Sequence, residues 1–152
     1  MKFVDELQNY LKARYPLILI KSTEEDRLTM DLKLAAQTLG HDLITWSIAS
    51  GLKSDNKQFD ISTVEPKKAI DICESIAKTD KPTIFVFYDI VPVISSPQTG
   101  AIYQRRLKEF ALNIRTHGYR CNCILVSAKS EIDGSINSEI TVLDYPLPNR
   151  QE

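Results

Sequence analysis

Five short runs of apolar residues, separated by amphipathic segments, restrict this chain to very few folds. In Leu17–Ile20 every residue is apolar, and the run from Thr83 to Ile90 is apolar or aromatic until Asp89. A strand with one wet face would alternate apolar and polar residues, whereas a strand covered on both faces is apolar throughout. The chain is therefore predicted to be an α/β protein, a three-layer αβα sandwich with a mainly parallel five-stranded sheet.

The apolar periodicity also predicts the order of elements. Strands are expected at 17–20, 43–49, 83–90, 123–128 and 140–143, and helices at 3–14, from about 23 to 40, from 66 to about 77, and at 101–115. Ser22 with Glu25 predicts a capping box for the second helix, and Pro66 a helix start. The last long helix is expected to bury Ile102 and Leu107. Segments 51–63 and 91–100 are expected to be loops, with residues 1–145 forming one domain and 146–152 a linker or tail.

Composition excludes several classes of protein. The net charge of −1 argues against a non-specific nucleic-acid binder, which normally presents a basic face. A cluster of basic residues nevertheless leaves a nucleic-acid-binding module open as an alternative, although a solvated outer face is the favoured interpretation: Arg105, Arg106, Lys108, Arg115 and Arg120.

The cysteines indicate structural rather than chemical roles. Cys73, Cys121 and Cys123 have no CxxC spacing, and the chain holds only two histidines, so no zinc site or other metal site is predicted. Buried, reduced thiols fit a cytosolic compartment. No signal-peptide pattern or apolar run of about 20 residues is present, so we expect no membrane segment.

The turn after the first strand lacks what a phosphate site requires. It reads Lys21-Ser22-Thr23-Glu24-Glu25-Asp26, with no glycine and three consecutive carboxylates. Backbone N–H groups bind phosphate where glycine permits close approach, and the usual motif adds a lysine and a Ser/Thr. Carboxylates at a helix N-terminus instead repel an anion. We therefore expect no nucleotide-binding residues and no cofactor.

Two polar residues end apolar strands where α/β sheets place functional groups. Asp89 could hold Mg²⁺, as the acidic residue of a Walker B strand does, or could simply terminate the strand or cap the following loop. Ile90 stands where a hydrolytic glutamate usually follows. Ser127 lies where ring ATPases keep a polar residue that senses the γ-phosphate, but it is equally compatible with an ordinary strand-end hydroxyl.

Longer patterns resemble a known family. They are Asp5-Glu6-Leu7, the stretch from Ala13 to Ile18, Thr23 to Arg27, Trp46-Ser47 with Gly51-Leu52, the strand ending in Asp89, and Ile140 to Pro148. The chain resembles the N-terminal domain of the AAA ATPases of cyanobacteria and algal plastids known as a hypothetical chloroplast reading-frame product. In that family this region is similar to a degenerate AAA core, a P-loop-NTPase-like fold lacking the P-loop, and it precedes an intact ATPase module.

The resemblance implies a sheet of order 5-1-4-3-2, with Asp89 at the Walker B position and Ser127 near sensor 1. This chain departs from a complete family member in stopping at Glu152, where the link to the ATPase module would begin. Between Arg120 and Arg150 there is no arginine, so the usual arginine-finger position is also empty. These features predict that the chain has no catalytic residues of its own.

The leading hypothesis is a non-catalytic AAA-like domain with a regulatory or assembly role, whose partner is an AAA ATPase module. It would reside in the cytoplasm, or in the plastid stroma if the source is an alga. One alternative is a metal-dependent Rossmann-like hydrolase or transferase that uses Asp89. That alternative requires a second carboxylate near Asp89, and the sequence offers no convincing one.

Overall fold

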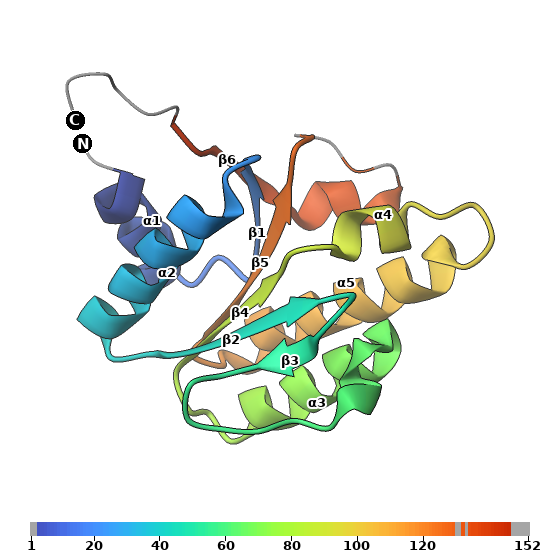
Figure 1. Ribbon diagram of the computed structural model, residues 1–152, viewed down its shortest axis with the longest axis horizontal. Coiled ribbons are helices and arrows are strands. Elements are labelled where there is room, and N and C mark those ends of the chain that lie inside the picture. The colour runs from blue at the N-terminus through green and yellow to red at the C-terminus, as the bar shows by residue number, and fades with distance from the viewer. Residues whose placement is uncertain (1–2, 130–131, 133, 147–152) are drawn as a thin grey trace.

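A six-stranded sheet forms the centre of the computed structural model, which describes residues 3–129, 132 and 134–146 (Figure 1). Its order is β3-β2-β4-β5-β1-β6, and all neighbouring strands are parallel except β2 and β3. The strands are β1 (Leu17–Lys21), β2 (Asp42–Ser47), β3 (Gly51–Lys53), β4 (Thr83–Phe87), β5 (Cys121–Ser127) and β6 (Thr141–Asp144). The predicted order 5-1-4-3-2 is confirmed, with β3 added as a sixth, antiparallel edge strand.

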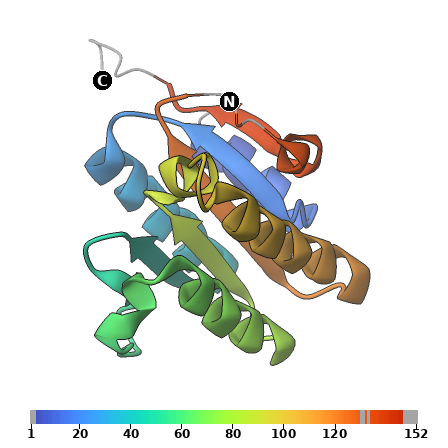
Figure 2. The same ribbon diagram turned by 90° about the vertical axis from the view of Figure 1, so that its right-hand side faces the viewer.

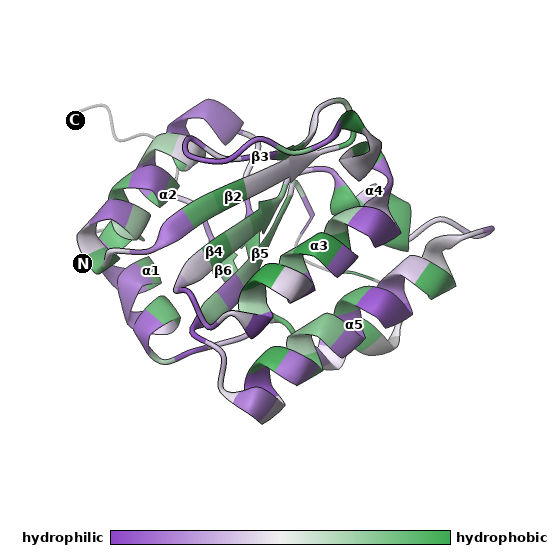
Figure 3. Ribbon diagram, turned by 90° about the horizontal axis from the view of Figure 1, so that it is seen from below, coloured by the Kyte–Doolittle hydropathy of each residue, from purple (hydrophilic) through white to green (hydrophobic). Residues whose placement is uncertain are grey.

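Helices cover both faces of this sheet, which confirms the three-layer sandwich. The α-helices are α1 (Phe3–Lys12), α2 (Glu25–Leu39), α3 (Pro66–Lys78), α4 (Ile90–Ile94) and α5 (Gly100–His117), and the 3₁₀ helices are η1 (Ile61–Val64) and η2 (Ser135–Glu139). Helices α1 and α2 lie on one face, and α3 and α5 lie on the other (Figures 1 and 2). The inner strands are strongly hydrophobic, whereas the helices carry hydrophobic and hydrophilic residues in alternation (Figure 3).

Alternate residues of each central strand enter two separate cores, which explains why the strands are apolar throughout. In β4, Phe85 and Phe87 pack against α3 and α5, whereas Ile84 and Val86 pack against α1 and α2. All four side chains are fully buried. The three cysteines are buried on the α3–α5 side, as predicted from their behaviour as small hydrophobic residues.

The segment 51–63, expected to be a loop, contains β3 and the start of η1. Gly51 adopts a φ of 70°, which lets the chain reverse directly after β2. Thr63, fully buried, then fixes the segment, because its Oγ1 accepts a hydrogen bond from the Leu52 N–H at 2.9 Å. Its carbonyl accepts one from the Trp46 indole at 2.8 Å. These long-range bonds are not visible in local sequence patterns.

Three further local predictions are wrong. The Ser22 hydroxyl accepts a hydrogen bond from the Glu24 N–H at 3.0 Å, which forms a side-chain turn. Helix α2 therefore begins at Glu25, and the predicted capping box does not form. Ile102 is 63% exposed instead of buried, since it lies on the side of α5 opposite to the buried residues such as Gly100 and Leu107. The segment 91–100, expected to be a loop, contains most of α4, which begins at Ile90. Strand β4 ends at Phe87 rather than at Ile90.

Candidate functional site

A pocket of about 910 Å³ lies at the carboxyl ends of β1, β4 and β5. Parallel α/β sheets usually bind their ligands at this edge. The structure places both sequence-predicted residues, Asp89 and Ser127, in the lining of this pocket. It also brings Glu25, Lys21 and Lys129 there.

The connection from β1 to α2 is only three residues long, Ser22, Thr23 and Glu24. Two of its backbone N–H groups are already bonded within the protein: the Ser22 N–H donates to the Ser127 carbonyl at 2.8 Å, and the Glu24 N–H donates to the Ser22 hydroxyl at 3.0 Å. The Glu24 side chain does not cap the helix. Helix α2 therefore begins almost directly after the strand, with Glu25 in its first position.

Asp89 binds the backbone of a neighbouring connection. Its Oδ2 accepts a hydrogen bond from the Ile48 N–H at 2.9 Å, which links the end of β4 to the turn between β2 and β3. Asp89 stands before the first residue of α4, but its side chain makes no capping bond to that helix. Two structural roles were predicted for Asp89, a polar residue that ends the strand and a cap for the following loop. The bond to Ile48 fits the first role and not the second.

Glu25 is the pocket residue that sequence analysis missed. The pKa of its carboxyl is raised, first by partial burial and then by the negative charges of Asp89 and Asp26. Asp89 therefore has a second carboxylate within electrostatic reach, which the sequence had not offered. Glu25 had been interpreted as half of a capping box and as one of three carboxylates that repel an anion, and no local signal shows that β4 carries Asp89 toward it.

Ser127 has the contacts expected of an ordinary strand-end hydroxyl. Its Oγ accepts a hydrogen bond from the Lys129 N–H at 3.1 Å, while its carbonyl binds the β1–α2 connection. The side chain thus shapes the turn after β5. Both of its polar groups participate in holding the pocket rim together.

A cluster beside the pocket fastens the described end of the chain to α2. The Arg27 guanidinium lies 4.3 Å from the centre of the Tyr145 ring and donates to Glu24 at 2.7 Å and to the Pro146 carbonyl. The Tyr145 hydroxyl donates to Asp31 at 2.5 Å. We call these residues, Glu24, Arg27, Asp31 and Tyr145, the Tyr145 clamp. Of the predicted linker or tail at 146–152, the structure describes Pro146, and 147–152 lie outside the described residues.

The basic residues considered for nucleic-acid binding are mostly neutralised by carboxylates. Arg106, whose side chain is 15% exposed, pairs with Asp71 at 2.7 Å and Glu74 at 3.1 Å, joining α5 to α3. The remaining described pairs are Arg105–Glu109, Arg115–Glu139 and Arg120–Asp80. Lys108 is half-buried on α5. This arrangement favours the structural interpretation over a phosphate-binding face.

The described part of the chain offers neither a cluster of metal ligands nor a helix that could span a membrane. Within residues 3–129, 132 and 134–146, no group of three or more His, Cys, Asp or Glu side chains is arranged to hold a metal ion. None of the helices in those residues combines the length and the apolar character needed to span a bilayer.

The sheet order, the two helical layers and the pocket at the strand ends together define an α/β domain of the AAA type. The chain belongs to the family of SpoVK-like AAA ATPase N-terminal domains, which matches residues 3–145. This result confirms the resemblance derived from the sequence motifs.

Similar proteins agree with this assignment. The chain is 27% identical to an AAA domain-containing protein ycf46 of Pyropia yezoensis and 27% identical to that of Trieres chinensis. Both matches cover 100% of this chain, which spans 30% and 29% of the two relatives. A chain of the E. coli MS115-1 HORMA:CdnC:Trip13 complex shares the fold with a TM-score of 0.63 and 11% identity, and the match covers 97% of this chain and 53% of that one.

Proposed function

We propose that this domain is a non-catalytic AAA-like domain with a regulatory or assembly role, and that its partner is an AAA ATPase module. The observation that carries the proposal is the three-residue connection between β1 and α2. A P-loop motif is about eight residues long and uses glycines to expose its N–H groups to phosphate. Ser22, Thr23 and Glu24 provide neither the length nor the glycines.

Electrostatics at the same position support the proposal. Glu25 and Asp26 open α2, and the pKa of Glu25 is already raised, first by burial and then by the charges of Asp89 and Asp26. A triphosphate placed against this turn would add further negative charge beside these carboxylates. Lys21 and Lys129 line the pocket, but both are exposed at its rim. We infer that this pocket is a feature of the AAA-like fold that does not bind nucleotide, and that ATP turnover takes place in a separate module.

Isothermal titration calorimetry with ATP or ADP and Mg²⁺ tests the first half of this proposal. We expect no detectable heat of binding, and a micromolar affinity, about −8 kcal/mol, would overturn it. Mixing the domain with the ATPase module of a ycf46-type relative tests the second half. We expect association by sedimentation velocity or a change in ATP turnover; if the module assembles and turns over as it does alone, the regulatory role fails.

A second candidate function is a metal-dependent hydrolase or transferase that uses Asp89. The proximity of Glu25 to Asp89 favours it, because two carboxylates on one pocket rim could share a divalent cation. Its weakness is that the Asp89 carboxylate already binds the Ile48 N–H. A phosphatase and esterase screen with Mg²⁺ and Mn²⁺, compared between the wild type and Asp89→Asn, decides between the two. The cellular location proposed for either function is the cytoplasm, or the plastid stroma in an alga.

A further inference from the structure

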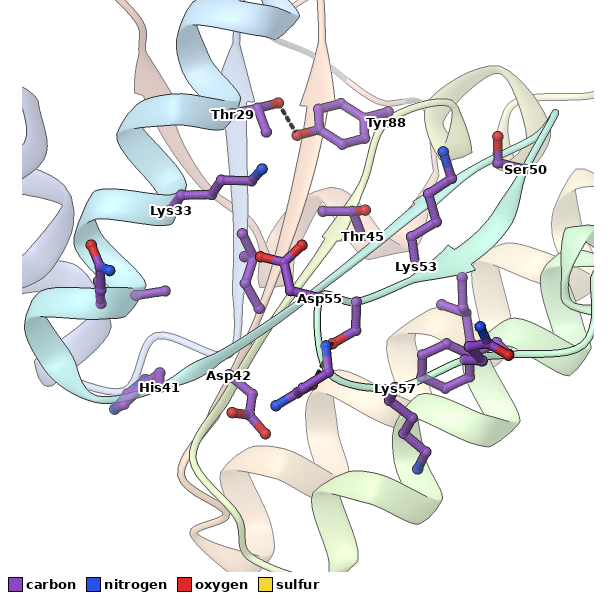
Figure 4. A pocket seen from close by; sticks show the side chains of 18 residues that line it. Thr29, Lys33, His41, Asp42, Thr45, Ser50, Lys53, Asp55, Lys57 and Tyr88 are labelled. Atoms are coloured by element: carbon purple, nitrogen blue, oxygen red, sulfur yellow. Dashed lines mark hydrogen bonds between the residues drawn. The ribbon is translucent and has the colours of Figure 1, made fainter.

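A second concave surface adjoins the carboxyl-end pocket, on the sheet face that α1 and α2 cover incompletely. We call it the Lys33–Lys53 groove. Its volume is about 880 Å³, and its walls are the side of α2 and the outer part of β2 and β3 (Figure 4). Tyr88 lines both cavities, and its hydroxyl is hydrogen-bonded to Thr29 of α2 at the boundary between them.

Two lysines dominate the charge of this groove. Lys33 extends from α2 and Lys53 from β3, on opposite sides of the same space (Figure 4). Both are exposed, and neither forms an ion pair with any residue in the described ranges. This contrasts with the arginines of α5, all three of which are paired with carboxylates.

The acidic residues of the groove leave an excess of positive charge. Asp42 lines the groove but is paired with Lys81 at 2.9 Å, outside the lining. Asp55 is the other carboxylate in the lining and lies between the two lysines in Figure 4. Lys57 points away from them, and its ammonium lies 5.4 Å from the centre of the Phe59 ring. A local positive surface on a chain with net charge −1 attracts an acidic partner.

Apolar side chains lie next to Lys33 on the same helix. Met30 is 72% exposed and Leu34 is 51% exposed. At a spacing of i and i+4 they share one side of α2 and form a short apolar strip. Met30 and Leu34 do not line the groove, but Met30 lies one helical turn before Lys33, so the strip adjoins the groove along α2. Exposed apolar residues beside a charged groove fit a surface that contacts another protein.

We propose that the Lys33–Lys53 groove, with Met30 and Leu34 at its rim, binds an acidic amphipathic segment of a partner protein. Carboxylates of that segment would pair with Lys33 and Lys53, while its apolar side chains would cover Met30 and Leu34. The inference rests on the proposed assembly role, because it identifies the surface through which that role is carried out. Nucleic acid fits less well, since the exposed side chains of Met30 and Leu34 suit contact with apolar side chains rather than with a phosphate backbone.

A peptide experiment tests the groove without requiring the natural partner. The probe is a fluorescein-labelled peptide of roughly 16 residues, about four helical turns, with leucines at i and i+4 and flanking glutamates. A matched peptide replaces each glutamate with glutamine. Fluorescence anisotropy should give a Kd on the order of 100 μM for the acidic peptide and a several-fold weaker one for the glutamine peptide. Affinity should fall as salt is raised, because exposed ion pairs are screened.

Matched variants assign the binding to the groove. The double variant Lys33→Gln/Lys53→Gln should weaken acidic-peptide binding about fivefold to tenfold. Lys78→Gln serves as the control, because this lysine is exposed on α3 across the sheet and should leave binding unchanged. Met30→Ser/Leu34→Ser should weaken both peptides. Equal binding by wild type and Lys33→Gln/Lys53→Gln, tighter binding of a single-stranded RNA of equal charge, or no peptide binding would each overturn the proposal.

Titrating the ¹⁵N-labelled domain with an ATPase module separates this inference from the proposed function. Association with chemical-shift changes confined to α2, β2 and β3 supports both. Association that shifts other surfaces, and that persists in Lys33→Gln/Lys53→Gln, keeps the assembly role but rejects the groove. Lack of association with the module, together with lysine-dependent peptide binding, rejects that partner and keeps the groove.

Discussion

Removing the Tyr145 hydroxyl from the Tyr145 clamp should measurably lower the free energy of unfolding of the domain. The substitution is Tyr145→Phe, which keeps the ring against Phe3, at 4.7 Å between centroids, and under Arg27. It deletes only the 2.5 Å hydrogen bond to Asp31. The side chain of Tyr145 is 8% exposed, and Asp31 is half-buried, so water replaces this bond only in part.

The expected loss of stability follows from the charge of the acceptor. Hydrogen bonds to charged groups contribute about 1.5–3 kcal/mol, and partial access of water to Asp31 lowers this to about 1–2 kcal/mol. For a chain of this size, that corresponds to a decrease in Tm of about 2–8 °C. Urea unfolding followed by fluorescence suits this measurement, because Trp46 is the single tryptophan and is 1% exposed.

Tyr103→Phe is the matched control for Tyr145→Phe. Its hydroxyl also donates to a carboxylate, that of Glu65 at 3.0 Å, but this bond lies at the surface. We expect about 0.5 kcal/mol or less from the control. Equal losses for the two variants, or no loss for Tyr145→Phe, would refute the claim that the clamp is a desolvated contact.

The same bond should depend on alkaline pH. Burial first, and then the bond to Asp31, raise the pKa of Tyr145 above the ordinary tyrosine value of about 10. A pKa raised in the folded state adds stability that is fully present below about pH 10 and is lost as pH rises through the folded value. The stability difference between wild type and Tyr145→Phe should therefore shrink above about pH 10. A difference that grows with alkaline pH would contradict this reasoning.

Three further substitutions test other parts of the structure. Gly51→Ala should cost about 2 kcal/mol or more in urea unfolding, because φ is 70° there and a Cβ would lie 2.4 Å from Thr63 Oγ1; a neutral effect would disprove this packing. Asp89→Asn should leave partner binding intact and cost no more than about 1–2 kcal/mol; loss of a metal-dependent activity would instead favour the enzyme. Arg106→Gln should destabilise by about 1–3 kcal/mol at pH 7 and by less below about pH 4. The pKa of Glu74 is lowered, because hydrogen bonds from Asn113 and Arg106 together outweigh the opposing effect of burial. The stability that the ionised Glu74 contributes is therefore lost as pH falls through its folded-state pKa. A loss of stability that does not change with pH would count against the pairing.

The order of the five parallel strands and the layered fold could be predicted from the sequence. Continuous apolar runs such as Leu17–Ile20 report burial on both faces, and that pattern is local. The family motifs then fixed the strand order. Burial of Cys73, Cys121 and Cys123 was predictable for the same reason, since free cysteine behaves as a small hydrophobic residue.

The site depended on contacts between residues far apart in the sequence, which local patterns do not contain. Glu25 approaches Asp89 because β1 and β4 end at the same edge of the sheet, and Tyr145 reaches Arg27 because β6 pairs with β1. Likewise, strand β3 is held in place by the hydrogen bond that the Leu52 N–H donates to the hydroxyl of Thr63, a residue that follows the strand. The sequence by itself determined the layered arrangement of five parallel strands and the absence of a glycine-rich turn, since both follow from local residue types. Only the tertiary structure decided which charges meet in the pocket, the clamp and the Lys33–Lys53 groove, because those meetings follow from strand register and helix packing.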